Sequence, residues 1–280
     1  MRGAAPMSSG RQEGQLCGRV AVVTGGGSGI GKAVCHALAS EGASVAVVDI
    51  DGQRLEDTVN GIDEQGYGVR AIGLNLDVTC ERDMQHMTCS VLDRFGALDI
   101  LVNSAGILRP PGSIPKPLVQ LTTSEWDAVI SVNLKGTFLA CRAVLPFMIS
   151  RRSGDVVNIS STYGRQGRAL DSVYSASKFG VIGLSEAVAD EVRQYGVRVQ
   201  VICPDAVNTP IWEQNGPIRP QEALDPSRVA EVIRYFVTLP SDTVIVGAVI
   251  APFKSRRRRM NRFARSTDKD EAITSALNEQ

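Results

Sequence analysis

The chain has 280 residues, of which 43% are hydrophobic and 21% charged, and 30 Lys and Arg balance 30 Asp and Glu. This length and composition suit one sizeable globular domain, because no linker rich in Pro, Gly and Ser divides the chain into two small ones. A net charge of zero disfavours a dedicated nucleic-acid binder and a protein that binds anionic membranes.

No apolar run reaches the length needed to span a bilayer, and residues 1–16 read as a flexible arm without a signal-peptide core. We therefore expect a cytoplasmic protein with no membrane partner. The six cysteines are scattered and form no C-x-x-C pair, so we expect reduced, structural cysteines rather than a disulfide framework or a metal site.

Short runs rich in Val, Ile and Leu alternate with longer amphipathic stretches along the chain. Seven runs predict strands: 20–24, 44–50, 69–78, 98–106, 155–161, 197–204 and 244–249. Their almost continuous apolar character is typical of strands buried on both faces of a parallel sheet. Strands that alternate with helices imply right-handed βαβ units. We predict a single doubly wound α/β (Rossmann) domain over residues 17–253, with about seven parallel strands and helices on both faces.

Two long helices are predicted in the second half of the chain. The first covers about 124–151, with Thr122 and Glu125 at the spacing of a capping box. The second covers about 173–195 and is followed by Gly196, which favours the left-handed turn after a helix.

Three stretches are irregular. Residues 108–120 and 208–223 follow strand ends, at the edge where ligands bind in such folds, so they are candidate substrate loops or simple connectors. The tail, residues 254–280, is basic and then polar. It reads as a solvated tail, with a subunit contact or anion binding as the alternatives.

The segment TGGGSGIG at 24–31 stands between a predicted strand and a predicted helix, which is the context of a dinucleotide-binding turn. Gly25 would permit the tight turn, Gly29 the approach of a pyrophosphate and Gly31 the packing of helix on strand. The helix N-terminus would attract the phosphates. A plain strand-to-helix turn is the alternative.

Asp49 ends the second predicted strand, where a carboxylate accepts hydrogen bonds from the adenosine ribose hydroxyls and repels a 2′-phosphate. Ser28 leaves the turn without a basic residue that would hold an extra phosphate. The sequence therefore favours NAD over NADP. A helix cap is the alternative role for Asp49, but Asp51 is better placed for it.

Tyr174 and Lys178 share one face of a predicted helix because they are four residues apart. That spacing alone is common and usually structural. It gains meaning from Ser161, at the end of a predicted strand, and from Asn133, in the middle of the preceding long helix.

With these residues the sequence resembles the short-chain dehydrogenase/reductase family over roughly residues 18–210. The motifs that carry the resemblance are Thr24-Gly25-x-x-x-Gly29-x-Gly31, Asp77, Asn103-Ser104-Ala105-Gly106, Asn133, Ser161 and Tyr174-x-x-x-Lys178.

The resemblance implies a role for each of the four catalytic candidates. Tyr174 would be the acid/base that exchanges a proton with the substrate oxygen, and Ser161 would polarise that oxygen. Lys178 would bind the nicotinamide ribose and favour tyrosinate, and Asn133 would hold a water that links Lys178 to solvent. Free tyrosine titrates near pH ~10, so ionising it near neutrality requires about 4 kcal/mol from close positive charge.

The resemblance also implies a cofactor site along the strand ends. Its expected residues are Gly25, Ser28, Gly29, Ile30, Gly31, Asp49, Ile50, Asp77, Val78, Asn103, Ala105, Gly106, Tyr174, Lys178, Pro204, Val207 and Thr209.

Two features depart from the family. Asp205 follows Pro204 where the family usually has Gly, which adds bulk and a charge beside the nicotinamide. The usual Asp-Gly-Gly after the last strand is missing. We still expect a homodimer or homotetramer that forms through the two long helices.

We predict an NAD-dependent oxidoreductase that interconverts a secondary alcohol and a ketone. The alternatives are an NADPH-dependent ketoreductase on acyl or polyketide-like substrates and a non-catalytic NAD-binding sensor. Residues that could wall an apolar substrate pocket are Ile107, Leu108, Leu170, Ile211 and Trp212. Arg109, Arg165 and Arg168 stand near its mouth and suit an anionic substituent, or they are simply solvated.

Overall fold

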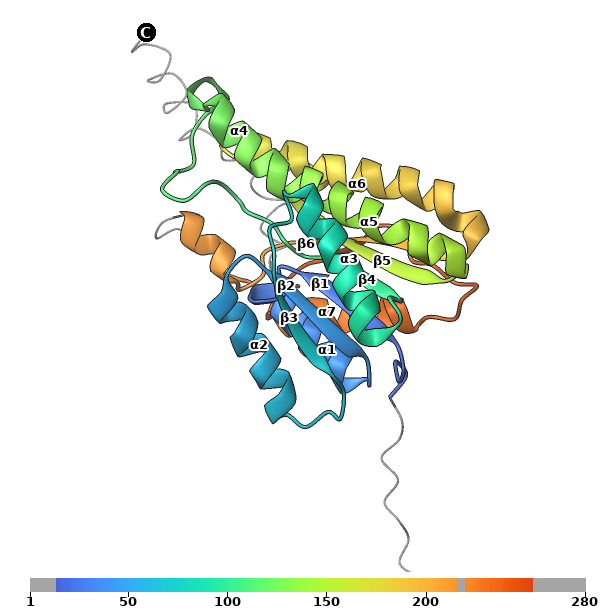
Figure 1. Ribbon diagram of the computed structural model, residues 1–280. Helices are drawn as coiled ribbons and strands as arrows, with labels where there is room; N and C mark the ends of the chain where they lie inside the picture. The colour runs from blue at the N-terminus through green and yellow to red at the C-terminus, as the bar shows by residue number, and fades with distance from the viewer. Residues whose placement is uncertain (1–13, 216–219, 254–280) are drawn as a thin grey trace, which may run out of the picture.

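The computed structural model describes residues 14–215 and 220–253 and contains one parallel sheet with helices on both faces (Figure 1). The strands are β1 (Val20–Thr24), β2 (Ser44–Asp49), β3 (Ala71–Asn75), β4 (Ile100–Asn103), β5 (Gly154–Ile159), β6 (Val197–Pro204) and β7 (Ala248–Ile250). Their order in the sheet is β3-β2-β1-β4-β5-β6-β7, and every pair is parallel. The predicted doubly wound α/β fold is confirmed.

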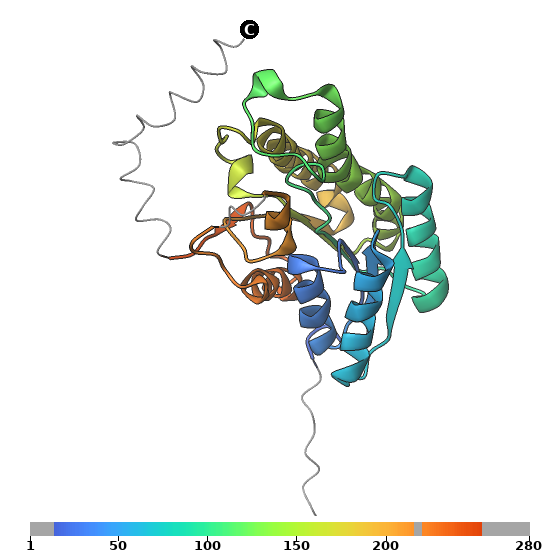
Figure 2. The same ribbon diagram turned by 90° about the vertical axis from the view of Figure 1, so that its left-hand side faces the viewer.

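The helices form two layers. One face of the sheet is covered by α1 (Gly29–Ser40), α2 (Gly52–Glu64) and α7 (Pro226–Thr238). The other is covered by α3 (Glu81–Phe95), α5 (Gly136–Arg151) and α6 (Ser172–Val192), and α4 (Thr123–Ile130) packs against α6. Figure 2 shows α1 and α2 side by side in blue.

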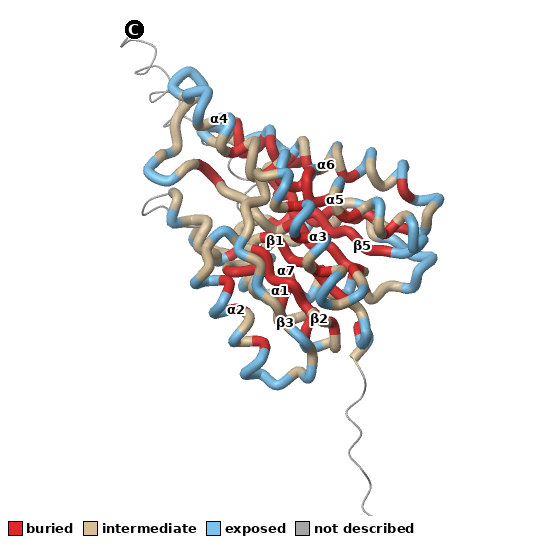
Figure 3. The backbone as a smooth tube through the Cα atoms, viewed as in Figure 1, coloured by how far each residue is buried: buried red, intermediate tan, exposed pale blue. Residues whose placement is uncertain are grey.

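The central strands are buried on both faces, which is why their sequences are almost continuously apolar (Figure 3). All residues of β1, β4 and β5 are buried, whereas the edge strands β3 and β7 are partly exposed. Leu16 is only 1% exposed and packs into this core, so the expected flexible arm of residues 1–16 is wrong at that position. Residues 1–13 of the expected arm and the tail at 254–280 lie outside the described residues.

The first long predicted helix has an irregular centre. Thr122 and Glu125 form the predicted capping box at the start of α4. A π-helical turn, η2 (Ser131–Lys135), then joins α4 to α5. π-turns inside helices often mark functional positions, and this one carries Asn133.

Together these segments make one helix of 29 residues, Thr123–Arg151, with a mean hydropathy of 1.4 over its most apolar stretch. By length and composition it qualifies as a membrane span, so the expectation that no apolar run reaches that length is wrong here. Its buried side, however, packs against α3 and α6 inside the domain. A core helix of a globular protein has the same properties.

The second predicted helix and the last strand are close to expectation. α6 continues into a 3-10 turn, η4 (Arg193–Tyr195), and Gly196 follows in the predicted left-handed conformation with φ +70°. β7 spans Ala248–Ile250 instead of 244–249. Gly247 has φ +66°, which is not a strand conformation, so the strand begins only after this residue. All six cysteines are free, and the described residues hold no cluster of His, Cys, Asp and Glu suited to a metal.

Candidate active site

The turn between β1 and α1 is packed so closely that glycine is required. A Cβ on Gly31 would lie 2.0 Å from the carbonyl oxygen of Gly25, and Gly25 itself has φ +65°. Gly29 has φ +50°. The three glycines picked out by the sequence therefore have the geometric roles expected of a dinucleotide-binding turn.

Two more predicted cofactor residues lie against this turn. A Cβ on Gly25 would meet the backbone of Ala105 at 2.7 Å, and one on Gly29 would meet Thr209 at 3.0 Å. Ser28 is the N-cap of α1, but its side chain makes no capping hydrogen bond. The turn thus offers main-chain N–H groups of the first helical turn to a phosphate.

Asp49 holds the turn from the end of β2. Its Oδ2 accepts a hydrogen bond of 2.9 Å from the N–H of Gly27, and its Oδ1 accepts one of 3.0 Å from the N–H of Asp51. The helix cap is Asp51, which accepts from the N–H of Arg54 at the start of α2. The preference for Asp51 as the cap is confirmed.

Arg54 was not singled out from the sequence, although it lies beside the same turn. A Cβ on Gly27 would come within 3.0 Å of the Cβ of Arg54. The Arg54 guanidinium pairs with Asp51 at 3.2 Å and is half exposed. The residue lies outside the Gly-rich segment, so only the fold reveals that Arg54 lies beside Gly27, which also adjoins the Asp49 carboxylate.

The predicted adenine-side residues lie along the same sheet edge. Ile50 is 70% exposed, and an exposed apolar side chain there suits a flat ring. Asp77 accepts from the N–H of Thr79 at 2.8 Å and so stabilises the turn before α3. Val78 packs against Gly136. Asn103 is buried and donates to Asn158 at 2.8 Å, which joins β4 to β5.

The four catalytic candidates converge at the carboxyl ends of β4 and β5. Ser161 follows β5, and its hydroxyl is a hydrogen-bond partner of the Tyr174 phenol. The ring of Tyr163 stands edge-on to that of Tyr174, with 5.6 Å between centroids. Burial raises the pKa of Tyr174 above its ordinary value, and the hydrogen bond with Ser161 opposes that rise.

Lys178 lies one helical turn beyond Tyr174 and is 5% exposed. Its Nζ donates a hydrogen bond of 2.9 Å to the carbonyl oxygen of Ile159 and stands 5.7 Å from the centre of the Tyr174 ring. Burial lowers the pKa of Lys178 to about 8. The ammonium can therefore exchange a proton near neutral pH.

Asn133 is fully buried in the π-turn and joins two segments of the site. Its Oδ1 accepts from the N–H of Ile107 at 2.8 Å, and its Nδ2 donates to the carbonyl oxygen of Ile107 and to Ser177. Both amide hydrogens thus bind protein groups. The predicted water between Asn133 and Lys178 stays a prediction.

Gly106 lies against the two buried polar side chains of the site. A Cβ on this residue would lie 3.5 Å from the Lys178 ammonium and 3.3 Å from the Asn133 side chain. The glycine turn after β1 and Gly106 after β4 follow neighbouring strands, at the edge where dinucleotides bind in such folds. When bound, that cofactor would accept or supply a hydride.

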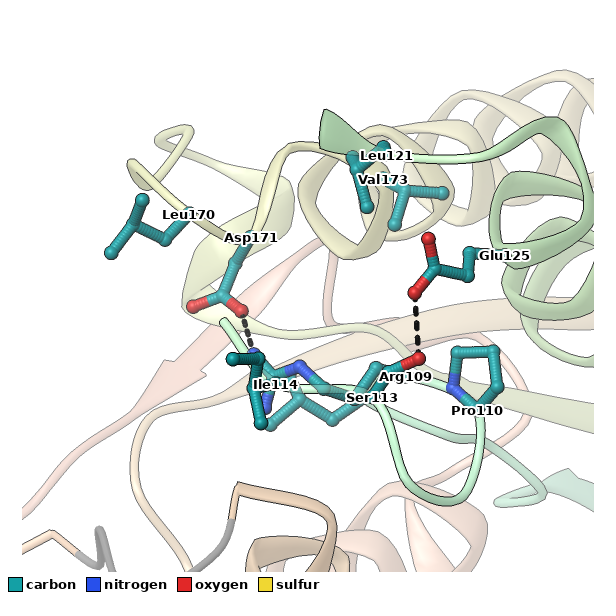
Figure 4. Close-up of a pocket in the computed structure, with 10 residues that line it drawn as sticks. Arg109, Pro110, Ser113, Ile114, Leu121, Glu125, Leu170, Asp171 and Val173 are labelled. Carbon is teal, nitrogen blue, oxygen red and sulfur yellow. Dashed lines mark hydrogen bonds and ion pairs between the residues drawn. The ribbon is translucent and has the colours of Figure 1, made fainter. Parts of the chain in front are cut away.

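A narrow pocket lies beside the site, between the 108–120 loop and the starts of α4 and α6 (Figure 4). It is lined by Leu108, Arg109, Pro110, Ser113, Ile114, Leu121, Glu125, Leu170, Asp171 and Val173. Leu170 has φ +68°, which is strained for a branched residue. Pairing with Lys116 and hydrogen bonds from Ser113 and Thr122 lower the pKa of Glu125 to about 2.

The three arginines expected at the mouth all bind protein groups. Arg109 is 6% exposed and forms an ion pair with Asp171. Arg165 donates to the carbonyl oxygen of Gly247 at 2.8 Å, and Arg168 lies over the ring of Tyr163. The reading of these residues as solvated loop arginines is wrong for Arg109.

Asp205, which replaces the usual Gly, accepts a hydrogen bond of 3.1 Å from the hydroxyl of Thr162. Its own N–H donates to the carbonyl oxygen of Ile250 in β7. The preceding Pro204 accepts from the Ser161 hydroxyl at 3.4 Å. The substituted residue is therefore bound into the wall beside Ser161.

Comparisons with known proteins agree with this geometry. The profile of the short chain dehydrogenase family matches residues 19–219. The 3-oxoacyl-(acyl-carrier-protein) reductase FabG of Thermotoga maritima is 35% identical over 245 residues, covering 84% of this chain and 96% of that protein.

Solved structures are similar over the same extent. A levodione reductase matches with a TM-score of 0.78 and 31% identity, covering 84% of this chain and 96% of that one. An actinorhodin polyketide ketoreductase with NADPH matches with a TM-score of 0.75 and 30% identity, covering 86% of this chain and 98% of that one. The chain belongs to the short-chain dehydrogenase/reductase family of oxidoreductases, which bind a nicotinamide cofactor.

Proposed function

We propose that the protein is an NAD-dependent dehydrogenase that interconverts a secondary alcohol and a ketone. The observation that carries the proposal is the convergence of Ser161, Tyr174 and Lys178 beside Gly106. A proton-transfer group, a hydrogen-bond donor and a cation stand together there, next to a site for a hydride carrier.

The chain's own residues supply the proton chemistry. In alcohol oxidation the Tyr174 phenolate takes the hydroxyl proton, and the Ser161 hydroxyl donates to the developing carbonyl oxygen. Oxidised nicotinamide, when bound, would accept the hydride that the adjacent carbon loses. In ketone reduction the neutral phenol donates the proton. Burial raises the pKa of Tyr174, so its phenolate needs the Lys178 ammonium nearby.

NAD is the proposed cofactor because of Asp49. Its carboxylate stands at the end of β2 against the glycine turn, where it would repel a 2′-phosphate. Arg54 supports the alternative, an NADPH-dependent ketoreductase. Its guanidinium is half exposed beside the same turn, and the similar polyketide ketoreductase was solved with NADPH.

The substrate is proposed to be a mostly apolar alcohol or ketone. Leu108, Leu170 and Val173 present apolar surface next to Tyr174. Arg109, the most deeply buried of the three nearby arginines, is already paired with Asp171, which disfavours it as a binding site for a substrate anion. We therefore propose no anionic group on the substrate.

A homodimer or homotetramer is proposed to form through the long helices. Phe138 on α5 and Phe179 on α6 are 40% and 47% exposed, as is typical of residues that a partner covers. A cytoplasmic location and the absence of nucleic-acid and membrane partners stay predictions.

The test is to measure turnover of a panel of secondary alcohols with NAD and, in parallel, with NADP. Turnover is monitored by the absorbance of the reduced cofactor. Tyr174→Phe should lose at least about a thousandfold in kcat while keeping its affinity for NAD. A Tyr195→Phe variant, changed at a partly buried tyrosine of the 3-10 turn η4, is the matched control. NAD binding with equal or absent turnover in parent and Tyr174→Phe would favour the non-catalytic sensor.

A further inference from the structure

Arg109 is a buried cation that joins three segments around the candidate site. Its guanidinium forms an ion pair with Asp171 and donates to the main-chain oxygen of Gln214 at 3.2 Å. Gln214 in turn accepts from the N–H groups of Leu108, at 2.7 Å, and Arg109. One residue thus connects the 108–120 loop, the start of α6 and the 3-10 turn η5 (Pro210–Asn215).

Asp171 has a special position in this cluster. It is the N-cap of α6, but its side chain makes no capping hydrogen bond, because the carboxylate turns towards Arg109 (Figure 4). Its carbonyl oxygen accepts from the N–H of Ser175, and its own N–H donates to the carbonyl oxygen of Arg168. Tyr174 lies on the first turn of α6, so the orientation of the Asp171 side chain affects the N-terminus of the helix that carries Tyr174.

The pair is also electrostatically close to Tyr174. A carboxylate near the phenol disfavours tyrosinate, and the Asp171 carboxylate adds to the raised pKa of Tyr174, after the larger effects of burial and of Tyr163. A guanidinium bound to that carboxylate cancels most of its field at short range. Within residues 14–215 and 220–253, the titratable and charged groups that face the phenol are Tyr163, Asp171 and Lys178. Arg168 lies over the Tyr163 ring, and Arg109 acts through Asp171.

We infer that Arg109 is a positioning residue, which fixes the start of α6 and neutralises Asp171 so that Tyr174 can act as a base. The inference rests on the proposed role of Tyr174 as acid/base. Arg109 lines the pocket beside the site, but in this assignment it acts through Asp171 and not by binding the substrate. It acts through Asp171, and its ties to Gln214 set the place of the substrate loop at the same time.

The experiment compares Arg109→Met, Arg109→Lys, Asp171→Asn and the double variant Arg109→Met/Asp171→Asn. Tyrosine labelled with 13C at Cζ reports ionisation directly, and Tyr174→Phe identifies the Tyr174 signal among the five tyrosines. The titration is run on the full chain with oxidised NAD bound, beside the pH profile of kcat/KM for alcohol oxidation.

The expected signs are opposite for the two partners. Arg109→Met removes the ion pair that Arg109 makes with Asp171 and raises the midpoint of the Tyr174 titration by about 0.5 to 1 pH unit. Asp171→Asn lowers it, and the double variant returns to within about 0.2 of the parent. Arg109→Lys keeps the parent midpoint. Gln214→Ala, which breaks the loop contact without changing a charge, raises KM about threefold and leaves the midpoint unchanged.

A purely structural role for Arg109 would overturn the inference. The Tyr174 titration would then have the same midpoint in Arg109→Met and in the double variant, and Asp171→Asn would have the midpoint of the parent. If Arg109→Met fails to fold, Asp171→Asn alone decides, because a lowered midpoint supports the inference and an unchanged one overturns it. Failure of the proposed function is distinguishable, since it would appear as equal turnover in the parent and Tyr174→Phe while the titration still reports on Arg109.

Discussion

The Nζ of Lys178 donates a hydrogen bond of 2.9 Å to the carbonyl oxygen of Ile159, the last residue of β5. This bond ties α6 to the strand that leads directly into Ser161, so it fixes the distance between the proton-transfer helix and the hydroxyl that would bind the substrate oxygen. It also buries an ammonium group that has no carboxylate partner among the described ion pairs.

That burial gives a prediction about stability. The folded protein holds Lys178 with a pKa of about 8, against 10.5 in an exposed lysine. Between pH 8 and 10.5 the unfolded chain binds more protons, so the free energy of unfolding rises with pH over that window. Lys178→Met removes the cost of burying the charge and should stabilise the protein by about 1–3 kcal/mol at pH 7 while abolishing turnover.

Urea denaturation at pH 7 and pH 10 measures this effect. The advantage of Lys178→Met over the parent should shrink at the higher pH, where the parent lysine is already neutral. Lys135→Met, at an exposed position of the π-turn, is the control. It should change the free energy of unfolding by the same small amount at pH 7 and at pH 10. A destabilised Lys178→Met with no dependence on pH would show that the Ile159 hydrogen bond outweighs the buried charge.

The sequence predicted the elements that depend on local patterns. Apolar runs marked all seven strands, Thr122 and Glu125 marked the start of α4, and Gly196 marked the turn after η4. The glycines of the β1–α1 turn also have their expected positions. These signals are short-range, because they report burial, capping and backbone conformation at the residue itself.

The features that the sequence missed depend on contacts between distant residues. Arg109 and Asp171 are 62 positions apart, and neither is unusual in its own segment. The π-turn around Asn133 has no composition signal, and the proximity of Arg54 to Gly27 appears only when α2 is placed beside the glycine turn. Such pairings require the three-dimensional fold, because nothing in the local pattern specifies them.

Gly31 gives a prediction about close packing. Gly31→Ala would place a Cβ 2.0 Å from the carbonyl oxygen of Gly25, a contact that backbone atoms cannot relieve without moving. We expect a loss of about 3 kcal/mol or more in the free energy of unfolding and a loss of cofactor affinity. Gly167→Ala, where a Cβ would meet open space, should change neither. Thermal denaturation with and without NAD measures both effects, and equal melting temperatures in the two variants would contradict the prediction.

Asp49 and Arg54 give a prediction about cofactor choice. Asp49→Ala removes the carboxylate that would repel a 2′-phosphate and should reduce the preference for NAD over NADP by about tenfold or more. Adding Arg54→Met to that variant should weaken the binding of NADP again, because the cation beside the glycine turn is then lost. Dissociation constants of both cofactors, measured by fluorescence, give the ratios. An unchanged ratio in Asp49→Ala would show that another feature selects the cofactor.

Asp205 and Thr162 give a prediction about the wall beside Ser161. Thr162 is buried, and its hydroxyl donates to Asp205 at 3.1 Å, so Asp205→Ala leaves a buried donor without this acceptor. We expect a cost of about 1–2 kcal/mol in the free energy of unfolding for Asp205→Ala.

Thr162→Val and the double variant complete a mutant cycle, with an expected coupling of about 1 kcal/mol measured by urea denaturation. Asp205→Asn is the control, because its amide oxygen still accepts the hydrogen bond. Asp205→Gly restores the residue usual in the family but lacks the acceptor, so it should resemble Asp205→Ala in stability. Additive effects of Asp205→Ala and Thr162→Val would mean that this hydrogen bond contributes nothing and that Asp205 is tolerated there only because its backbone fits the turn.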